Sequence, residues 1–254
     1  MALTGKSKKD TYKDLLYLNN SNTGVPATTP TNIEDGTGNK TAAKISQDKV
    51  LIQPNTNNTS DAFKISDSSG NTALTVDTTN RLVKVNTTQD YANTQYQRFH
   101  SLQISSADGT WYSMSMIGGD SAGMSLGTSA SAPATTLTAD YRGVNHYWYI
   151  MDNITIDAIR VWHMGDDSSS SDTLKYQLFV YTVDTSGAGS GDLSSGVAHA
   201  SSSSQSIDNV DMDTHTLSIA TANIDAGKVA LMCVYADTSN NDITSQVIIK
   251  YHIR

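Results

Sequence analysis

The residues with the clearest potential for chemistry are a serine between two glycines, six histidines and one cysteine. Gly123-Met124-Ser125-Leu126-Gly127 matches the pattern G-x-S-x-G, which activates its serine only at a sharp turn from a strand into a helix. The residues around this pentapeptide are rich in Gly, Ser and Ala, and they predict a loop instead of a helix. We therefore do not expect Ser125 to act as a nucleophile.

The histidines and aspartates form no recognisable metal-binding pattern. The sequence contains no H-x-H or H-E-x-x-H arrangement, and Cys233 has no cysteine partner. The run Asp208-Asn209-Val210-Asp211-Met212-Asp213 offers carboxylate oxygens that could hold Ca²⁺, but it lacks the glycine and the terminal glutamate of an EF-hand loop. An exposed acidic turn is the favoured interpretation, and we predict neither a metal ion nor a cofactor.

Two further features have a catalytic and a structural interpretation. Asp152 with Asp157, and the adjacent pair at 166–167, could form a glycosidase pair, but a sequence does not fix the separation of two carboxyl groups. Cys233 lies in the apolar run 229–235, which indicates a buried and inert thiol. No catalytic constellation is supported, and we predict that the protein is not an enzyme.

Aromatic residues in predicted strands suggest a binding role instead. They are Trp111, Tyr147, Trp148 and Tyr149, with Trp162 in a further strand. Aromatic rings on a β-sandwich fill the core most often, but exposed rings stack on sugars or anchor subunit contacts. Because side chains alternate along a strand, Trp148 must face away from Tyr147 and Tyr149. We predict that one of these two sets lies on the surface or at a subunit contact, where host surface glycans or another subunit would bind.

The composition favours strands and turns over helices. Of the 254 residues 37% are hydrophobic, and Ser, Thr, Asn and Asp are abundant; these short polar side chains compete with the helical backbone. The formal net charge is −8 and the few Lys and Arg residues are scattered, so we expect no nucleic-acid partner. The N-terminal residues lack the apolar segment of a signal peptide, and the sequence has no run of 18 apolar residues, so we expect no membrane insertion.

Two stretches that repeat one another about 31 residues apart organise the N-terminal part of the chain. Gly38-Asn39 opens the first stretch and Gly70-Asn71 opens the second, and each leads into a further short apolar strand, 50–52 or 82–85. Strands this short bury little area, whereas ordering each residue costs about 1 to 2 kcal/mol of backbone entropy. We therefore predict a repetitive β shaft in which three chains wind together. One wall of a larger monomeric sandwich is the alternative.

Residues 1–34 are predicted to form an anchoring segment. A helix would place Tyr12, Leu15 and Leu16 on one face, whereas a strand would place Tyr12, Leu16 and Leu18 on one side. A helix this short is marginal in water and needs a partner surface. The segment therefore either packs on its own domain or docks on a larger particle.

The same region resembles a known class of proteins. Thr11-Tyr12-Lys13-Asp14-Leu15-Leu16, Asn20-Ser21-Asn22-Thr23-Gly24-Val25 and Glu34-Asp35-Gly36-Thr37-Gly38 are similar, in order and spacing, to the N-terminal module of fibre and decoration proteins of tailed bacteriophages, especially marine phages. The resemblance covers the first 50 residues or so. It implies a virion protein, usually a homotrimer, that is fixed to capsid or tail proteins by its N-terminus.

The remaining sequence carries stronger alternating strands. We expect them at 99–104, 111–117, 147–150, 154–164, 174–183, 214–219, 229–235 and 243–253. About eight strands separated by polar loops predict an antiparallel sandwich, most closely a jelly roll, and a change of phase along the fourth strand predicts a bulge near Ala158. Three polar stretches are expected to lack strands, a linker at 89–98 and solvated loops at 165–172 and 185–205.

These expectations combine into one functional hypothesis. The chain is predicted to be an all-β virion protein with an anchor at 1–34, a shaft at 35–90 and a jelly-roll head at 99–254. A trimeric head fibre or capsid decoration protein is the favoured interpretation. A short tail fibre or adaptor whose head binds host surface glycans is the alternative.

Overall fold

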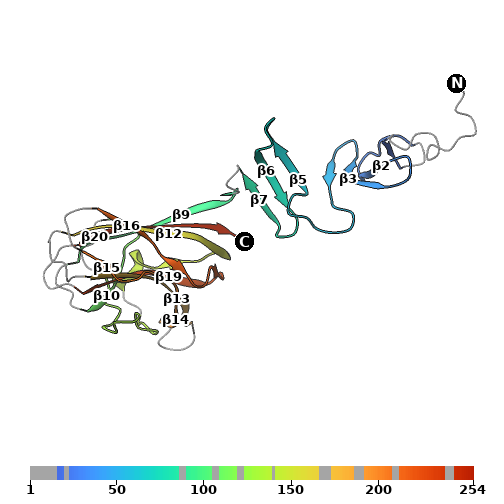
Figure 1. Cartoon of the computed structure of the whole chain (residues 1–254). Helices are drawn as coiled ribbons and strands as arrows, with labels where there is room; N and C mark the ends of the chain where they lie inside the picture. The colour runs from blue at the N-terminus through green and yellow to red at the C-terminus, as the bar shows by residue number, and fades with distance from the viewer. Residues whose placement is uncertain are drawn as a thin grey trace, which may run out of the picture. The chain divides into compact units, whose positions relative to one another are not determined.

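The computed structural model describes residues 16–19, 23–85, 90–104, 109–118, 123–138, 141–165, 173–185, 192–207, 212–237 and 243–254. Strands make up most of these residues, and the only helical segment among them is the 3₁₀ helix η1 (Tyr141–Asn145). The chain divides into two compact units, Met1–Ala92 and Asn93–Arg254 (Figure 1). The predicted all-β fold class is therefore confirmed.

The first unit, which we call the shaft unit, contains two four-stranded antiparallel sheets. One has the order β1-β2-β3-β4 and is formed by β1 (Tyr17–Leu18), β2 (Thr31–Glu34), β3 (Lys40–Ile45) and β4 (Val50–Ile52). The other has the order β5-β6-β7-β8 and is formed by β5 (Phe63–Ser66), β6 (Thr72–Asp77), β7 (Leu82–Val85) and β8 (Asp90–Tyr91). The predicted boundary between anchor and shaft, at residues 34 and 35, lies between two paired strands of the first sheet.

The predicted repeat is visible in the turns of the two sheets. Oδ1 of Asp35, in the β2–β3 turn, accepts the backbone N–H groups two and four positions later at 2.8 and 2.9 Å. Oδ1 of Asp67, in the β5–β6 turn, accepts the two corresponding N–H groups at 2.8 Å. Gly38 and Gly70 have φ values of 90° and 87°, which L side chains rarely adopt. The glycine of each Gly-Asn turn is thus required by the backbone conformation.

The second unit, which we call the head, is built from two antiparallel sheets. The first has the order β16-β12-β20-β9, formed by β16 (Asp213–Thr216), β12 (Ile154–Gly165), β20 (Ile243–Ile253) and β9 (Thr94–Ile104), with β18 (Asn223–Ile224) beside β12. The second has the order β10-β19-β13-β14-β17, formed by β10 (Thr110–Ser113), β19 (Lys228–Asp237), β13 (Thr173–Val183), β14 (Leu193–Ser201) and β17 (Ser218–Ile219). The short strands β11 (Trp148–Tyr149) and β15 (Gln205–Ser206) pair with β19 and β13.

The order of the strands is that of a jelly roll. The eight main strands in chain order are β9, β10, β12, β13, β14, β16, β19 and β20, and we number them 1 to 8. One sheet then has the strand order 1-8-3-6, and the other has the order 2-7-4-5. Two sheets formed by eight antiparallel strands with Greek-key connections define this fold. We call the two sheets the first-strand sheet, which contains β9, and the second-strand sheet, which contains β10.

Three local predictions have different outcomes. The bulge is confirmed, because the β12–β20 register shifts between Ile156 and Ala158. The polar linker at 89–98 is wrong over most of its length, because β8 occupies Asp90–Tyr91 and β9 begins at Thr94. The solvated loop at 185–205 is also wrong, because β14 pairs with β13 there. A Cβ at Gly196 of β14 would lie 2.5 Å from the Tyr181 ring, so this position of the strand requires a glycine.

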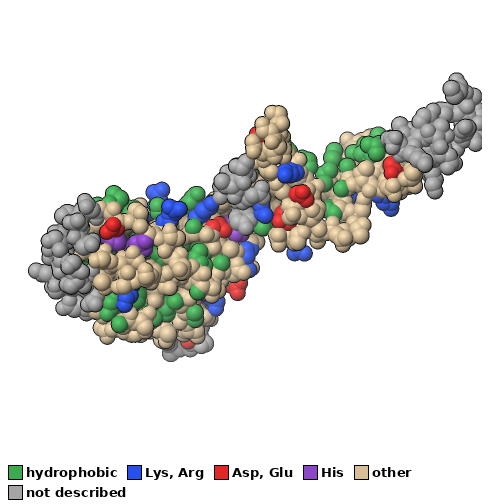
Figure 2. Space-filling model, in the orientation of Figure 1, with side chains coloured by type: hydrophobic (Ala, Val, Ile, Leu, Met, Phe, Trp, Pro, Cys, Tyr) green, Lys and Arg blue, Asp and Glu red, His purple; other side chains and the backbone are tan. Residues whose placement is uncertain are grey.

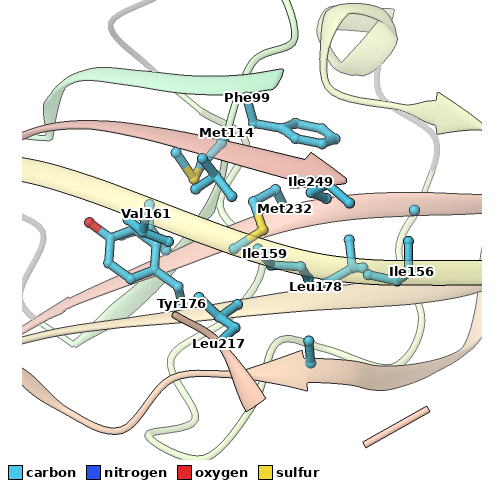
Figure 3. Close-up of a cluster of buried hydrophobic side chains, with 14 of the residues drawn as sticks. Phe99, Met114, Ile156, Ile159, Val161, Tyr176, Leu178, Leu217, Met232 and Ile249 are labelled. Atoms are coloured by element: carbon cyan, nitrogen blue, oxygen red, sulfur yellow. The ribbon is translucent and has the colours of Figure 1, made fainter. Parts of the chain in front are cut away.

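The head has two layers of apolar packing, one on each face of the second-strand sheet. Between the sheets, side chains from β9, β12, β13, β19 and β20 interdigitate, among them Phe99, Ile159, Tyr176, Met232 and Ile249 (Figure 3). Those of β19 alternate between this layer and a second layer on the other face of the same sheet. Consequently β19 is buried on both faces.

The second layer is closed by the segment that connects β10 to β12. Leu126 is buried there, and its N–H donates to the carbonyl of Trp111 in β10 at 2.7 Å, while the N–H of Trp111 donates to the carbonyl of Gly127 at 2.9 Å. Tyr181, from β13, donates its hydroxyl hydrogen to the carbonyl of Ala134 at 2.9 Å. This connecting segment, which includes the G-x-S-x-G pentapeptide, therefore covers the sheet and belongs to the fold.

Cys233 provides a test of this double layer. The thiol is fully buried in the second layer, and burial raises its pKa well above the usual range. We expect Cys233 of the native protein to resist thiol reagents at neutral pH and to react fully in denaturant, as followed by mass spectrometry. Rapid labelling of the native protein would contradict the assignment of β19 as a strand covered on both faces.

Candidate functional site

The most unusual surface of the described residues is an apolar face on the second sheet of the shaft unit. The register pairs Phe63 with Val76 and Val76 with Val83. One pleat further along, it pairs Ile65 with Leu74 and Leu74 with Val85. Directly paired residues project to the same side of a sheet, and so do residues two apart on one strand. We call the set Phe63, Ile65, Leu74, Val76, Val83 and Val85 the shaft apolar face.

This face is left open to solvent while the opposite face of the same sheet is partly covered. Phe63, Ile65 and Val83 are 39%, 46% and 42% exposed. On the other side, Thr75 and Asp77 are buried. A sheet in an isolated globular protein normally buries its apolar face and exposes its polar face. The arrangement here is the reverse, because the apolar side of the sheet is the more exposed one.

The first sheet of the shaft unit is also incompletely covered. Val50 pairs with Ile45, and Leu51 pairs with Lys44, so Val50 and Leu51 project to opposite faces of the sheet. Both are exposed, Val50 at 74%. The repeat thus preserves the turns, while among the described residues both sheets leave apolar side chains exposed.

Carboxylates fix the turns beside these strands. Hydrogen bonds, first from the Thr37 hydroxyl and then from Asn39, hold the pKa of Asp35 well below its usual range. Hydrogen bonds from Asn71 likewise lower the pKa of Asp67. Each carboxylate accepts several N–H groups of its own turn in its ionised form, which is the form those donors favour. The geometry of both turns therefore depends on the charge of one aspartate.

The predicted anchoring residues fall at the edge of the described region. Tyr12 and Leu15 lie outside the described residues, and Leu16 is exposed. The chain continues as strand β1, which pairs with β2. The amide of Asn19 donates to both carboxylate oxygens of Glu34 at 3.0 Å, which ties the end of this segment to β2.

Of the four predicted binding aromatics, Trp111 is buried, Tyr147 and Trp148 are half-buried and Tyr149 is exposed. Trp111 is fully buried, and its Nε1–H donates to the carbonyl of Ser129 at 2.8 Å, so the prediction that Trp111 binds a glycan or a subunit is wrong. Its ring packs against Tyr235 with the ring centroids 5.2 Å apart, because both belong to the second apolar layer of the head.

The run at 147–149 divides as alternation predicts. Trp148 is half-buried and packs against the core between the sheets, with its ring centroid 5.1 Å from that of Tyr251. Tyr147 packs on the opposite layer, where its hydroxyl lies 3.5 Å from the sulfur of Met124. Tyr149 is 56% exposed. An open hollow of about 220 Å³ is lined by Trp148, Tyr149 and Tyr251, so the structure brings two of the predicted binding aromatics to one surface.

The serine and histidine candidates have structural surroundings. Ser125 is exposed in an extended bridge opposite Tyr112, not at a strand-to-helix turn. The nearby Ser113 hydroxyl does lie 3.0 Å from Nδ1 of His146 and accepts the N–H of Met124 at 2.9 Å. Ser113 and His146 are both buried, so a substrate has no access to this pair. It joins the covering segment to β10.

A second histidine group lies at the β12–β16 edge, inside the sandwich. The rings of His163 and His215 have centroids 5.4 Å apart, and Nε2 of His163 lies 3.9 Å from the carboxylate of Asp213. Burial lowers the pKa of His215 to about 4, and the charge of the neighbouring His163 contributes to this shift. Within the described residues no group of three His, Cys, Asp or Glu side chains is arranged to hold a metal ion, and no helix is long and apolar enough to cross a membrane.

Comparison with known proteins adds little to these observations. No family model and no curated protein matches this chain. A chain in the crystal structure of the T13 IBDV viral particle is similar to 65% of this chain at 7% identity, with a TM-score of 0.24. The similarity spans 41% of that viral chain. A TM-score this low leaves fold and function to be argued from the residues themselves.

The shaft turns predict a response to acid. A folded-state pKa below the ordinary value of an aspartate means that Asp35 and Asp67 stabilise the turns above that ordinary pKa. This contribution is lost as the pH falls through the lowered pKa. We expect hydrogen exchange of the turn amides to accelerate as the pH falls below about 4, after correction for the intrinsic exchange rate. Asp35→Asn and Asp67→Asn should accelerate it already at neutral pH, whereas Asp48→Asn, in the exposed turn before β4, should not. If the turn amides of a variant with both substitutions exchanged as slowly as those of the native protein, the role of the two carboxylates in the turns would be contradicted.

Proposed function

We propose that the protein is a non-enzymatic structural protein of a tailed-phage virion, in which the shaft unit joins three chains and each chain displays a jelly-roll head. The single observation that carries the assembly part is the shaft apolar face. The remaining parts are supported by the resemblance at residues 11–38 and by the length of chain devoted to the head.

The argument for assembly is energetic. Each apolar side chain gains about 1.5 to 3 kcal/mol on complete burial. Phe63, Ile65 and Val83 gain only part of this in a single chain because they remain about two-fifths exposed. Covering them with the same face of other copies would complete the burial without a further protein. Self-association therefore accounts for a sheet that is apolar on its open side.

The number of chains and the location rest on the N-terminal resemblance. The phage proteins that residues 11–38 resemble are usually homotrimers fixed by their N-termini, so three copies of this chain would meet along the shaft and dock through Tyr12, Leu15 and Leu16. A capsid head fibre or decoration protein is the favoured placement. A short tail fibre or adaptor is the alternative, and gold-labelled antibody on intact particles distinguishes the two.

Replacement of Phe63, Ile65 and Val83 by Ser should dissociate the native oligomer. Completing the burial of these three side chains is worth about 2 to 3 kcal/mol per chain, or roughly 30- to 150-fold in association constant. We expect light scattering coupled to size exclusion to give a trimer for the native chain and monomer for the triple variant at micromolar concentration.

The matched control is Val197→Ser, which removes a comparably exposed apolar side chain from β14 of the head. It should leave the oligomer intact. A native chain that is monomeric and folds cooperatively at micromolar concentration would overturn the assembly proposal.

The anchoring role has its own test in virions. Replacing Tyr12, Leu15 and Leu16 by Ala removes side chains that would each contribute about 1.5 to 3 kcal/mol if buried on the particle. We expect purified particles to lack the variant protein although it still folds and associates in solution. Val25→Ala, at another exposed position of the shaft unit, is the control. Normal incorporation of the triple variant would show that the segment packs on its own chain instead.

A further inference from the structure

The outer face of the first-strand sheet carries an ordered set of polar and aromatic side chains. The register aligns Thr214 of β16, Trp162 of β12, Gln246 of β20 and His100 of β9 in one row across the sheet. Nε1–H of Trp162 donates to Oε1 of Gln246 at 2.9 Å, and Nε2 of Gln246 lies 3.3 Å from Nδ1 of His100. These contacts hold the tryptophan ring in one orientation on a face that points away from the core.

The adjacent rows supply positive charge. One row contains Thr216, Arg160, Ile248 and Arg98, and the next contains Lys250 and Tyr96. Figure 2 shows Lys and Arg side chains along this side of the head. The segment 93–254 has only seven Lys and Arg residues against 16 Asp and no Glu, and three of the seven lie on this face. The face is therefore basic on a head that is acidic as a whole.

A shallow hollow lies at the centre of the set. It has a volume of about 270 Å³ and is lined by Arg160, Trp162, Thr214, Thr216 and Ile248, with parts of two inward residues. Among the described residues, no ion pair or hydrogen bond engages the guanidinium of Arg160, which is exposed. The hollow is about the size of a sugar ring. It is lined by the unpaired guanidinium of Arg160, the fixed indole ring of Trp162 and two threonines.

We propose that this hollow binds an anionic saccharide, with a sugar ring stacked on Trp162 and its carboxylate or phosphate group held by Arg160. Indole rings pack against the apolar faces of sugars, and a guanidinium forms two parallel hydrogen bonds with a carboxylate or a phosphate. Thr214 and Thr216 offer hydroxyl groups to the sugar hydroxyls. Arg98 and Lys250 extend the positive charge along the sheet, so a linear acidic polymer fits this surface better than a single residue.

Other occupants fit less well. A neutral sugar would leave the Arg160 charge without a partner, and an apolar protein surface would bury the charged side chains of two rows at a cost in desolvation. Burial lowers the pKa of His100, and the positive charge of Arg98 lowers it further. His100 is then neutral at neutral pH, which leaves its Nδ1 able to accept the Gln246 amide and keeps the row in order.

This inference goes beyond the proposed function, because the hollow is formed within a single head. The test therefore uses the full chain both in its native form and as the monomeric Phe63/Ile65/Val83→Ser variant. Isothermal titration with a galacturonic acid hexamer, a neutral glucose hexamer and inorganic phosphate separates an acidic saccharide from a neutral one and from a free anion.

We expect the galacturonate hexamer to bind the full chain and its monomeric variant with the same affinity per head. Arg160→Gln should weaken this binding roughly 10- to 100-fold through loss of a charged hydrogen-bond donor. Trp162→Ala should weaken it about three- to tenfold through loss of stacking, and Trp162→Phe should retain most of it. Lys175→Gln removes one charge from the second-strand sheet and should have no effect.

Circular dichroism and the thermal transition of each variant establish that it is folded, and Trp162→Phe keeps the stacking test valid if Trp162→Ala is destabilised. Equal binding of the neutral hexamer would overturn the role of charge. Unchanged binding by a folded Arg160→Gln variant, binding of phosphate but not of the hexamer, or no binding of either would overturn the saccharide site. None of these outcomes changes the oligomeric state, so failure here is distinct from failure of the assembly proposal.

Discussion

Burial of β19 on both of its faces is the constraint on which the architecture of the head depends. One face of this strand packs between the two sheets, and the other needs a cover of its own. The long segment between β10 and β12 provides that cover through Leu126, which is buried and donates a backbone hydrogen bond to Trp111 of β10. As a result β19 is covered on both faces at the centre of the second-strand sheet, whereas β12 and β20 of the first-strand sheet have an open outer face among the described residues.

The shaft unit differs from the head, because apolar side chains of both its sheets are exposed among the described residues. Its turns are well determined by aspartate hydrogen bonds and by glycines with positive φ, so the strands form in a defined register. That register then aligns six apolar side chains on a face that nothing in the described chain covers. Local order without a core is the condition in which association with identical chains supplies the missing burial.

The two units therefore suggest a division of labour within one polypeptide. The shaft unit presents apolar surface, which suits association with its own kind, whereas the open sheet of the head presents Arg160, Trp162 and other polar groups, which suit a soluble or surface-bound ligand. The apolar side chains of β19 in the head are covered on both faces, in contrast to those of the shaft apolar face.

The sequence by itself determined the features that depend on neighbours along the chain: the all-β class, the Gly-Asn turns, the bulge near Ala158 and the apolar character around Cys233. It also determined that Trp148 faces away from Tyr149, because alternation is a local property of a strand. Which face of a strand is covered was decided only by the tertiary structure. Trp111 is buried because the segment between β10 and β12 folds back over it. Trp162 is near Gln246 and His100 only because β9, β12 and β20 are paired. Periodicity specifies two sides of a strand, but long-range pairing decides which side meets water.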